Sequence, residues 1–143
     1  MISLADDKLT EARDHALAEY PNECCGIVIG KPDHTENDQI FRCTNIQNQL
    51  HEQDPKTYVR DARTAYYIDP RELMRVMKQA QEQDLVIKLF YHSHPEHDAY
   101  FSDEDKRMAL FDNEPTYPDA CYLVISVYNR AIRDQAFFEW RPE

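Results

Sequence analysis

The sequence predicts a single three-layer domain of the α/β or α+β class over residues 1–143. Short apolar, β-branched segments of strand length are mixed with three longer segments of helix length. A chain of 143 residues suits one domain with one hydrophobic core. There is no internal repeat and no linker-like stretch, and the two glycines exclude the glycine-rich phosphate-binding motifs.

The N-terminal third predicts one helix and one β-hairpin. Apolar residues recur at helical spacing over Leu4–Tyr20, and Pro21 ends that pattern. The segment Glu23–Gly30 is apolar on both faces, which indicates a buried strand. After a polar turn, Gln39–Cys43 predicts the hairpin partner of that strand.

The middle of the chain predicts a long loop, a short strand and a helix. Residues 45–63 show no periodicity and are rich in polar side chains, so we expect a surface loop of the kind that is often functional. Ala65–Ile68 predicts a short strand. Asp69 as N-cap and Pro70 at the first helical position predict a helix that runs to about Gln83. Its expected core face comprises Leu73, Val76, Met77 and Ala80.

The C-terminal half predicts a buried strand, a helix and a final pair of strands. The apolar segment from Val86 should remain extended until Pro95, which cannot donate to a sheet ladder. Ser102–Phe111 predicts a helix, and residues 112–119 with two prolines predict a turn. Cys121–Val127 is a predicted buried strand that turns back into residues 131–140.

Composition narrows the function classes. Sixteen basic and 27 acidic residues give a net charge of −11, and such an acidic chain is a poor candidate for binding nucleic acid. No apolar run approaches the length of a membrane span, and the N-terminus lacks the pattern of a signal peptide. We therefore expect a cytoplasmic protein without nucleic-acid or membrane partners.

The four cysteines do not predict a disulfide framework. They show no Cys-x-x-Cys spacing, and a cytoplasmic chain keeps its thiols reduced. Cys24 and Cys25 are adjacent, so in a strand they point to opposite faces. We expect buried or half-buried thiols that pack as small hydrophobic groups.

Two histidines end the most apolar of these strands, in the segment Tyr91–Pro95. His92 and His94 stand two residues apart, so both imidazoles leave the same face of an extended chain. Ser102 predicts a helix N-cap, and Asp105 follows three residues later in the first turn. Two imidazoles and one carboxylate, with the fourth position left to water, form the ligand set of a hydrolytic zinc site. We therefore hypothesise a zinc ion bound by His92, His94 and Asp105.

The same residues also have a plain structural interpretation. Most His-x-His pairs are ordinary surface or edge histidines, and a Ser-x-x-Asp helix start is a common capping motif. Their occurrence together, after a hydrophobic strand and across a short polar loop, is more specific than either alone. Spacing by itself leaves both interpretations open.

A hydrolytic zinc site needs a general base and an oxyanion donor. The candidate bases are Glu23, Glu96 and Glu104, and Glu23 stands out because it begins an otherwise apolar strand. The alternative is that Glu23 is merely exposed before the strand begins. Ser102 could donate to an oxyanion, although its helix cap is a sufficient structural role. Five other residues are expected away from the chemistry, His97 and Asp98 at the rim and His15, His34 and His51 exposed.

Several catalytic motifs are absent from the sequence. There is no His-Glu-x-x-His, which excludes a thermolysin-type protease. There is no His-x-Glu with Pro-Cys-x-x-Cys, which excludes a zinc nucleobase deaminase. The Gly-x-Ser-x-Gly nucleophile elbow is also missing.

Taken together, these residues resemble the JAMM signature of the MPN-domain metallopeptidases, in their stand-alone bacterial form. The resemblance rests on His-Ser-His-Pro at residues 92–95, then Ser102 and Asp105, with Glu-Cys-Cys-Gly upstream at residues 23–26. It extends from about Ser3 to Trp140 through the helix start at residues 68–73 and the strand at 122–127.

The resemblance implies a role for each of these residues. His92, His94 and Asp105 would bind one zinc ion, with water as the fourth ligand. Glu23 would be the general acid and base, and Ser102 would steady the oxyanion. The implied fold is a curved mixed β-sheet flanked by helices, similar to the cytidine-deaminase architecture.

The resemblance also implies an activity. Members of the family hydrolyse peptide or isopeptide bonds after the C-terminal tail of ubiquitin or ubiquitin-like proteins, and related small bacterial enzymes trim sulfur-carrier proteins. We therefore expect a zinc peptidase or isopeptidase in sulfur-carrier processing or deconjugation, working by glutamate-assisted attack of a zinc-bound water. Two alternatives are a phage-tail-associated peptidase and a non-catalytic MPN scaffold.

The sequence departs from the family pattern in two respects. Phe101 stands where many relatives have proline, which should alter the stiffness of the loop before Ser102 rather than remove the chemistry. The chain also lacks the additional zinc-binding insertion of some deubiquitinating relatives. Selectivity for one ubiquitin-chain linkage is therefore not expected.

Overall fold

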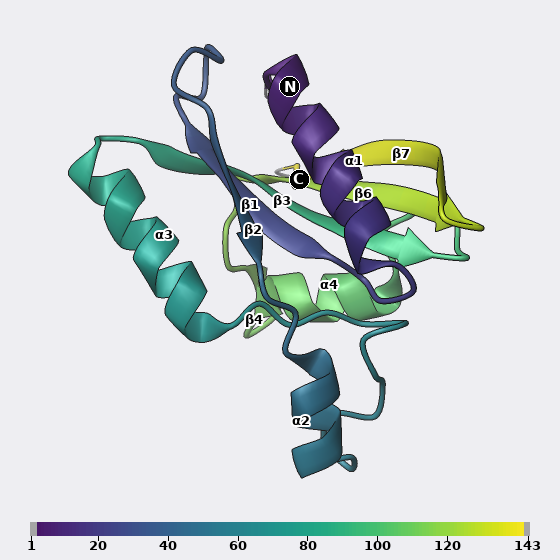
Figure 1. The fold of residues 1–143 in the computed structure, drawn as a ribbon. Helices are drawn as coiled ribbons and strands as arrows, with labels where there is room; N and C mark the ends of the chain where they lie inside the picture. The colour runs from purple at the N-terminus through teal and green to yellow at the C-terminus, as the bar shows by residue number, and fades with distance from the viewer. Residues whose placement is uncertain (1–2, 142–143) are drawn as a thin grey trace.

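A computed structural model describes residues 3–141 and shows a mixed five-stranded β-sheet flanked by helices (Figure 1). The strand order is β2-β1-β3-β6-β7. The strand bounds are β1 Cys25–Gly30, β2 Gln39–Cys43, β3 Val86–Pro95, β6 Cys121–Tyr128 and β7 Ala131–Glu139. Only β3 and β6 are parallel among the paired strands of this sheet; the other neighbours are antiparallel. The α+β class and the flanked mixed sheet predicted from the sequence are confirmed.

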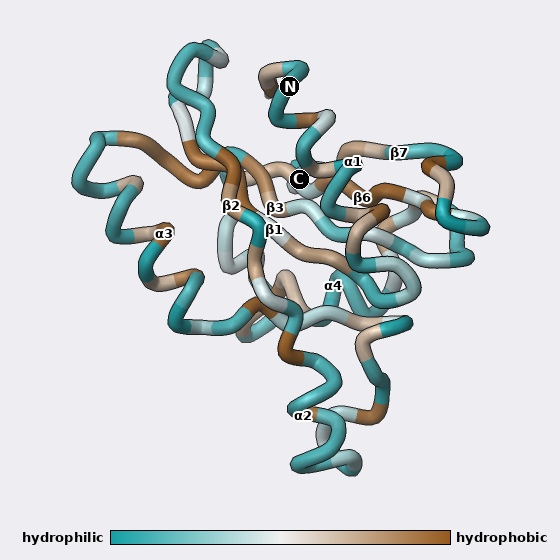
Figure 2. Tube along the Cα trace, in the orientation of Figure 1, coloured by the Kyte–Doolittle hydropathy of each residue, from teal (hydrophilic) through white to brown (hydrophobic). Residues whose placement is uncertain are grey.

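Helices cover both faces of the sheet and give two separate cores. The helix bounds are α1 Asp6–Glu19, α2 Gln47–Gln53, α3 Pro70–Glu82 and α4 Asp103–Ala109. One core packs α1 against the sheet through side chains such as Ala12, Ala16 and Val28. The other core lies on the opposite face, where Val76 and Ala80 of α3 pack. The central strands are the most hydrophobic part of the chain (Figure 2). Cys24 and Cys25 belong to different cores, as their adjacent positions predict.

The structure corrects the expectation for residues 45–63. This segment contains α2, which projects from the body of the sheet (Figure 1). The strand expected at Ala65–Ile68 is reduced to one isolated bridge between Asn45 and Ile68. The reason is that the Asn45 side chain takes up backbone groups of this segment, donating to the Ala65 carbonyl and accepting from the Tyr67 N–H.

The end of one helix and the burial of one side chain also differ from the sequence prediction. The helix expected at Ser102–Phe111 ends at Ala109, because residues 110–111 form a two-residue strand, β4, with β5 at Glu114–Pro115. Met77 was expected in the core but is 43 % exposed. It lies at the edge of the face on which α3 packs, where hydrophobic spacing alone does not separate core from rim.

Two polar pairs are buried inside the fold. Lys88 and Asp38 are both fully buried and form a salt bridge of 2.6 Å. On the α1 face, His15 is only 5 % exposed and its Nδ1 lies 2.7 Å from the Tyr91 hydroxyl. The expectation that His15 is exposed is therefore wrong, because α1 turns this side chain towards the sheet. Within residues 3–141, none of the helices combines the length and apolar character required to cross a membrane.

Candidate metal centre

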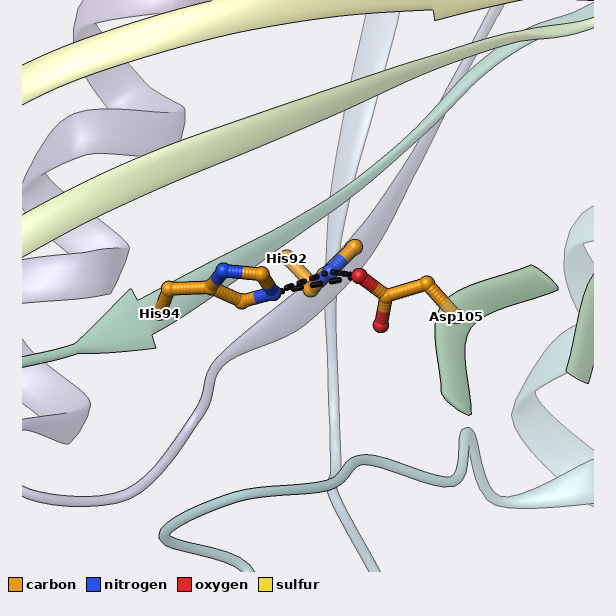
Figure 3. A group of neighbouring side chains, drawn as sticks. All are labelled: His92, His94 and Asp105. Carbon is orange, nitrogen blue, oxygen red and sulfur yellow. Dashed lines mark hydrogen bonds and ion pairs between the residues drawn. The ribbon is translucent and has the colours of Figure 1, made fainter. Parts of the chain in front are cut away.

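The C-terminal end of β3 and the first turn of α4 bring three side chains together. His92 and His94 leave one face of β3, and Asp105 reaches them from α4 (Figure 3). All three residues are buried. Ser102 begins α4 as its N-cap, where its hydroxyl accepts from the Asp105 N–H and its own N–H donates to the Asp105 carboxylate, both at 3.0 Å. This reciprocal capping box fixes the rotamer that points the carboxylate towards the histidines.

The three donor atoms have the spacing of ligands around one ion. The two Nε2 atoms lie 3.3 Å apart, and each lies 3.1 Å from Asp105 Oδ2. Ligands about 2.0–2.2 Å from a tetrahedral zinc are separated by about 3.3–3.5 Å. Two nitrogens and one carboxylate oxygen also match the donor set that zinc prefers in hydrolytic sites. The residues therefore fit a zinc ion with one coordination position left open.

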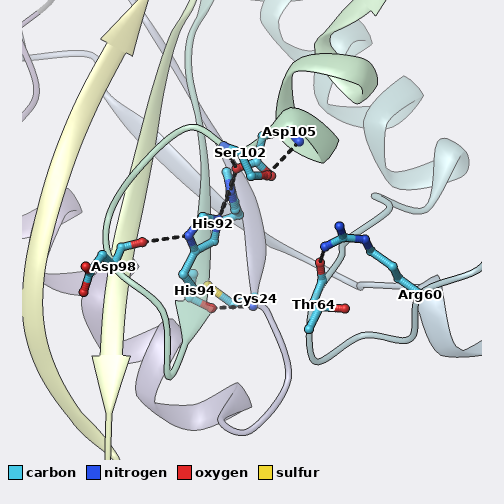
Figure 4. Close-up of polar contacts among 9 residues, drawn as sticks. Cys24, Arg60, Thr64, His92, His94, Asp98, Ser102 and Asp105 are labelled. Carbon is cyan, nitrogen blue, oxygen red and sulfur yellow. Dashed lines mark hydrogen bonds and ion pairs between the residues drawn. The ribbon is translucent and has the colours of Figure 1, made fainter.

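Contacts behind the imidazoles orient them. His94 Nδ1 lies 2.9 Å from the Asp98 carbonyl, which accepts a hydrogen bond from the protonated Nδ1 and leaves Nε2 with its lone pair free for a metal (Figure 4). The loop that carries Asp98 is held in turn, since Tyr128 donates to the Asp98 carboxylate and Ser126 donates to the His97 carbonyl. The His92 ring stacks on Tyr66 with centroids 4.5 Å apart.

Phe101 anchors the chain immediately before Ser102. Its ring packs against Tyr122 and Phe138, with centroid distances of 5.1 and 5.5 Å, and against Trp140 at 6.4 Å. This aromatic cluster fixes the path of the chain into α4.

The electrostatic environment lowers the pKa of two of the three candidate ligands, His92 and Asp105. Burial lowers the pKa of His92, which outweighs the opposing effect of Asp105, so the imidazole stays neutral. Burial alone would raise the pKa of Asp105, but the two imidazoles beside it hold that pKa well below the ordinary value. Neutral imidazoles and an ionised carboxylate are the forms that bind a metal cation.

Glu23 is the one candidate base that lies buried beside these ligands. It lies two residues before Cys25, the first residue of β1, which pairs with His92 of β3. It is only 3 % exposed, and its Oε1 is buried without a hydrogen-bond partner among the described residues. Burial raises its pKa well above the ordinary value, and the Asp105 charge adds to that rise. The interpretation of Glu23 as an exposed residue before the strand is excluded by this burial.

The backbone around Glu23 is tied to both neighbouring segments. The following residue, Cys24, donates its N–H to Ser93 Oγ at 2.8 Å, between the two histidines (Figure 4). The Glu23 N–H donates to the Ala62 carbonyl at 2.7 Å, and the Glu23 carbonyl accepts from the Asn45 side chain at 2.9 Å. The carboxylate is therefore placed by the metal-site strand on one side and by residues 45–62 on the other.

The other candidate residues lie apart from the cluster or are already paired. Glu96 is exposed and accepts from the Tyr20 hydroxyl and the Asn129 N–H. Glu104 forms a salt bridge with Arg107 on α4. His97, His34 and His51 take no part in the cluster, which in the described chain consists of His92, His94 and Asp105.

The polar residues that hold the backbone around Glu23 were not predicted from the sequence. Asn45, Gln47 and Asn48 are ordinary amides in a segment without periodicity, so no local pattern distinguishes them. The available signal was the length of the segment, since long loops in small domains are often functional.

Comparison with known proteins decides the family. Residues 6–141 match the family model described as prokaryotic homologs of the JAB domain. The chain belongs to this prokaryotic JAB family. The resemblance to stand-alone bacterial JAMM/MPN proteins is thereby confirmed.

Curated relatives of this JAB protein include two with printed activities. A CysO-cysteine peptidase of Mycobacterium tuberculosis is 30 % identical over 112 residues, which cover 78 % of this chain and 64 % of the relative. A desampylase of Haloferax volcanii is 27 % identical over 121 residues, which cover 85 % and 74 %. The chain thus spans less than two thirds of the mycobacterial relative.

A solved structure of a Desulfitobacterium hafniense protein has the same fold. It superimposes with a TM-score of 0.65 at 24 % identity, over 100 % of this chain and 94 % of the other. At this identity the likeness concerns the architecture of the sheet and its helices.

Proposed function

We propose that this JAB protein is a zinc-dependent peptidase that hydrolyses the bond after the C-terminal tail of a ubiquitin-like or sulfur-carrier protein. The observation that carries the proposal is the buried Glu23 side chain beside the His92–His94–Asp105 cluster, whose Oε1 has no hydrogen-bond partner among the described residues. An unpaired buried carboxylate is costly for a fold and is expected where catalysis requires it. The named activities of the two relatives supply the substrate class.

His92, His94 and Asp105 would hold the metal, and the lowered pKa values of His92 and Asp105 keep those two side chains in the forms that bind a cation. A bound zinc ion supplies a Lewis acid for the scissile carbonyl and lowers the pKa of a water near it. The Asp98 carbonyl keeps the His94 ring in the tautomer that presents Nε2. The capping box of Ser102 keeps Asp105 in place before any metal arrives, so the site needs little rearrangement.

Glu23 would move the proton. In its ionised form the carboxylate takes a proton from the attacking water, and the raised pKa makes it a stronger base than an exposed glutamate. It then donates the same proton to the departing amine. The free Oε1 is not tied up in a structural hydrogen bond, so it can make and break contacts with water and amine.

Ser102 would stabilise the oxyanion of the tetrahedral intermediate. Its hydroxyl oxygen accepts from the Asp105 N–H, which leaves the hydroxyl hydrogen available to donate. The hydroxyl sits on the N-cap of α4, next to the carboxylate that would bind the metal. One side chain can therefore serve the helix and the reaction together.

The test is zinc content measured together with cleavage. Wild type and Glu23→Gln are purified, zinc per chain is counted, and each is offered ubiquitin-like carriers with a short C-terminal extension. We expect one zinc in both proteins, and a turnover of Glu23→Gln reduced by about 10²–10⁴-fold, the usual contribution of a general acid and base. Glu104→Gln is the matched control, since its carboxylate lies on α4 and is paired with Arg107. Normal turnover by zinc-loaded Glu23→Gln, or wild type without zinc, contradicts the proposal.

A further inference from the structure

A groove runs beside Glu23, between the segment that follows α2 and the end of β3. It has a volume of about 460 Å³ and its lining includes Arg60, Arg63, Thr64, Pro95 and His97. The groove lies close to Glu23, because the carbonyl of Ala62, which stands between the lining residues Asp61 and Arg63, accepts the Glu23 N–H. A group that leaves beside Glu23 would therefore lie near this groove.

The charged residues of the groove differ in how far they are already neutralised. Arg63 forms a two-pronged pair with the Asp61 carboxylate, with Nη2 at 2.8 Å and Nε at 3.2 Å from Oδ2. Glu96 is occupied by the Tyr20 hydroxyl and the Asn129 N–H. Arg60 has no carboxylate within ion-pair distance among the described residues, and its guanidinium donates only to the Thr64 carbonyl at 3.3 Å (Figure 4). Arg60 is thus the cation of this groove that is left to pair with a ligand.

The backbone of Arg60 is fixed, although its side chain is exposed. The buried amide of Gln47 donates to the Arg60 carbonyl at 2.8 Å. Two residues on, the Ala62 N–H donates to the Asn48 side chain at 2.7 Å. Helix α2 therefore holds Arg60 next to Glu23, close enough that its positive charge opposes the rise in the pKa of the Glu23 carboxyl.

The chemistry of the proposed reaction indicates what this cation would meet. Glu23 hands its proton to the departing amine, so groups near Glu23 face the leaving group. When the leaving group is a single α-amino acid, its carboxylate is attached to the carbon next to that amine. A guanidinium is the side chain best suited to bind a carboxylate, through two parallel N–H donors. A lysine side chain released from an isopeptide bond has no free carboxylate at that distance from its amine.

We propose that Arg60 binds the α-carboxylate of a single C-terminal residue, and that this site therefore prefers to remove one amino acid from a carrier tail over cleaving an isopeptide bond. The inference rests on the proposed peptidase function. It assigns a specificity role to a residue outside the metal ligands and the catalytic glutamate.

The test compares one substrate in two chemical forms. A ubiquitin-like sulfur-carrier protein extended by one alanine is prepared with a free C-terminal carboxylate and with a C-terminal carboxamide. Wild type should cleave the acid about tenfold or more faster in kcat/KM, in line with one charge-assisted hydrogen-bonded pair. Arg60→Gln should lose this preference by slowing the acid alone, mainly through KM, and Arg60→Lys should retain part of it.

Arg63→Gln is the matched control, because it removes a cation of the same groove that Asp61 already neutralises. It should retain the preference of wild type. Equal cleavage of acid and amide by wild type, or an unchanged preference in a folded Arg60→Gln, overturns the assignment of Arg60 while the peptidase function stands. Cleavage of neither form by zinc-loaded wild type overturns the proposed function, and this inference with it.

Discussion

Two buried carboxylates in this fold differ in whether their oxygens have partners. Asp38 is fully enclosed and both of its oxygens are satisfied, Oδ1 by Lys88 at 2.6 Å and Oδ2 by the Ala5 N–H at 3.0 Å. Glu23 is at least as buried, with 3 % of its surface exposed against 6 % for Asp38, but its Oε1 has no partner among the described residues. Asp38 faces the beginning of β3, whereas Glu23 lies beside the histidines at the end of that strand.

The difference separates a structural acid, Asp38, from the acid that we propose to be catalytic, Glu23. Asp38 directly precedes β2 and links it to the N-cap of α1 through Ala5 and to β3 through Lys88. Lys88 also donates to the His34 carbonyl. Its charge is compensated within the fold. Glu23 has no ion-pair partner among the described residues and Arg60 offsets only part of the effect, so burial raises its pKa and the folded state carries the cost. This cost is what the proposed role in proton transfer explains.

The largest expected effect on stability comes from breaking the paired carboxylate. Asp38→Asn leaves the Lys88 ammonium buried without its counter-charge, which typically costs about 3–5 kcal/mol in the free energy of unfolding. Denaturant unfolding at neutral pH measures it. The zinc-loaded fraction that remains folded should keep wild-type kcat/KM, since Asp38 has no contact with the metal cluster.

A second substitution sharpens this result. The double variant Asp38→Asn/Lys88→Met no longer buries an unpaired ammonium group. It should therefore regain most of the free energy of unfolding that Asp38→Asn loses. If the two single losses simply add, the pair is not acting as one unit.

His15 extends the comparison to a buried base. Burial lowers its pKa to about 4 from an ordinary value of 6.5. Between these two pKa values the unfolded chain binds a proton at His15 and the folded chain does not. The free energy of unfolding therefore falls as the pH drops from about 6.5 to 4. The difference of about 2.5 between these two pKa values corresponds to a loss of at most about 3.4 kcal/mol in the free energy of unfolding. His15→Gln should flatten that part of the pH profile of unfolding, whereas His34→Gln, at an exposed site, should leave it as in wild type.

Ser102 caps α4 with its hydroxyl, and we propose that the same hydroxyl also stabilises the oxyanion. Ser102→Ala should lower the stability by about 1 kcal/mol through loss of the N-cap. It should also lower kcat by about 10²-fold through loss of an oxyanion donor. Ser102→Gly separates the two effects, because glycine is tolerated as an N-cap but has no hydroxyl. Full activity in Ser102→Gly would remove Ser102 from the mechanism.

Local patterns in the sequence were sufficient for the part of the site formed by β3 and α4. The spacing of His92 and His94 places both on one face of a strand, and the cap at Ser102 places Asp105 in the first turn of a helix. Each of these relations spans at most a few residues, so the sequence states it directly.

Long-range partners could not be predicted in the same way. The helix α2 was missed because its residues show no apolar periodicity and its contacts are polar, such as Gln47 with the Arg60 carbonyl. The burial of His15 depends on Tyr91, 76 residues away, and that of Asp38 on Lys88, 50 residues away. A single sequence contains no pattern that pairs such positions.

The contrast between Asp38 and Glu23 is tested most directly by the free energy of unfolding as a function of pH. It is measured for wild type and Glu23→Gln, both without metal. The folded-state pKa of Glu23 is raised, so its burial costs increasing stability as the pH rises above the unfolded value of about 4.3. We expect Glu23→Gln to be more stable than wild type by about 1 kcal/mol or more at pH 7, with the difference disappearing near pH 4. A variant that is less stable than wild type at pH 7 would show that Glu23 is a structural acid like Asp38, and would contradict this account.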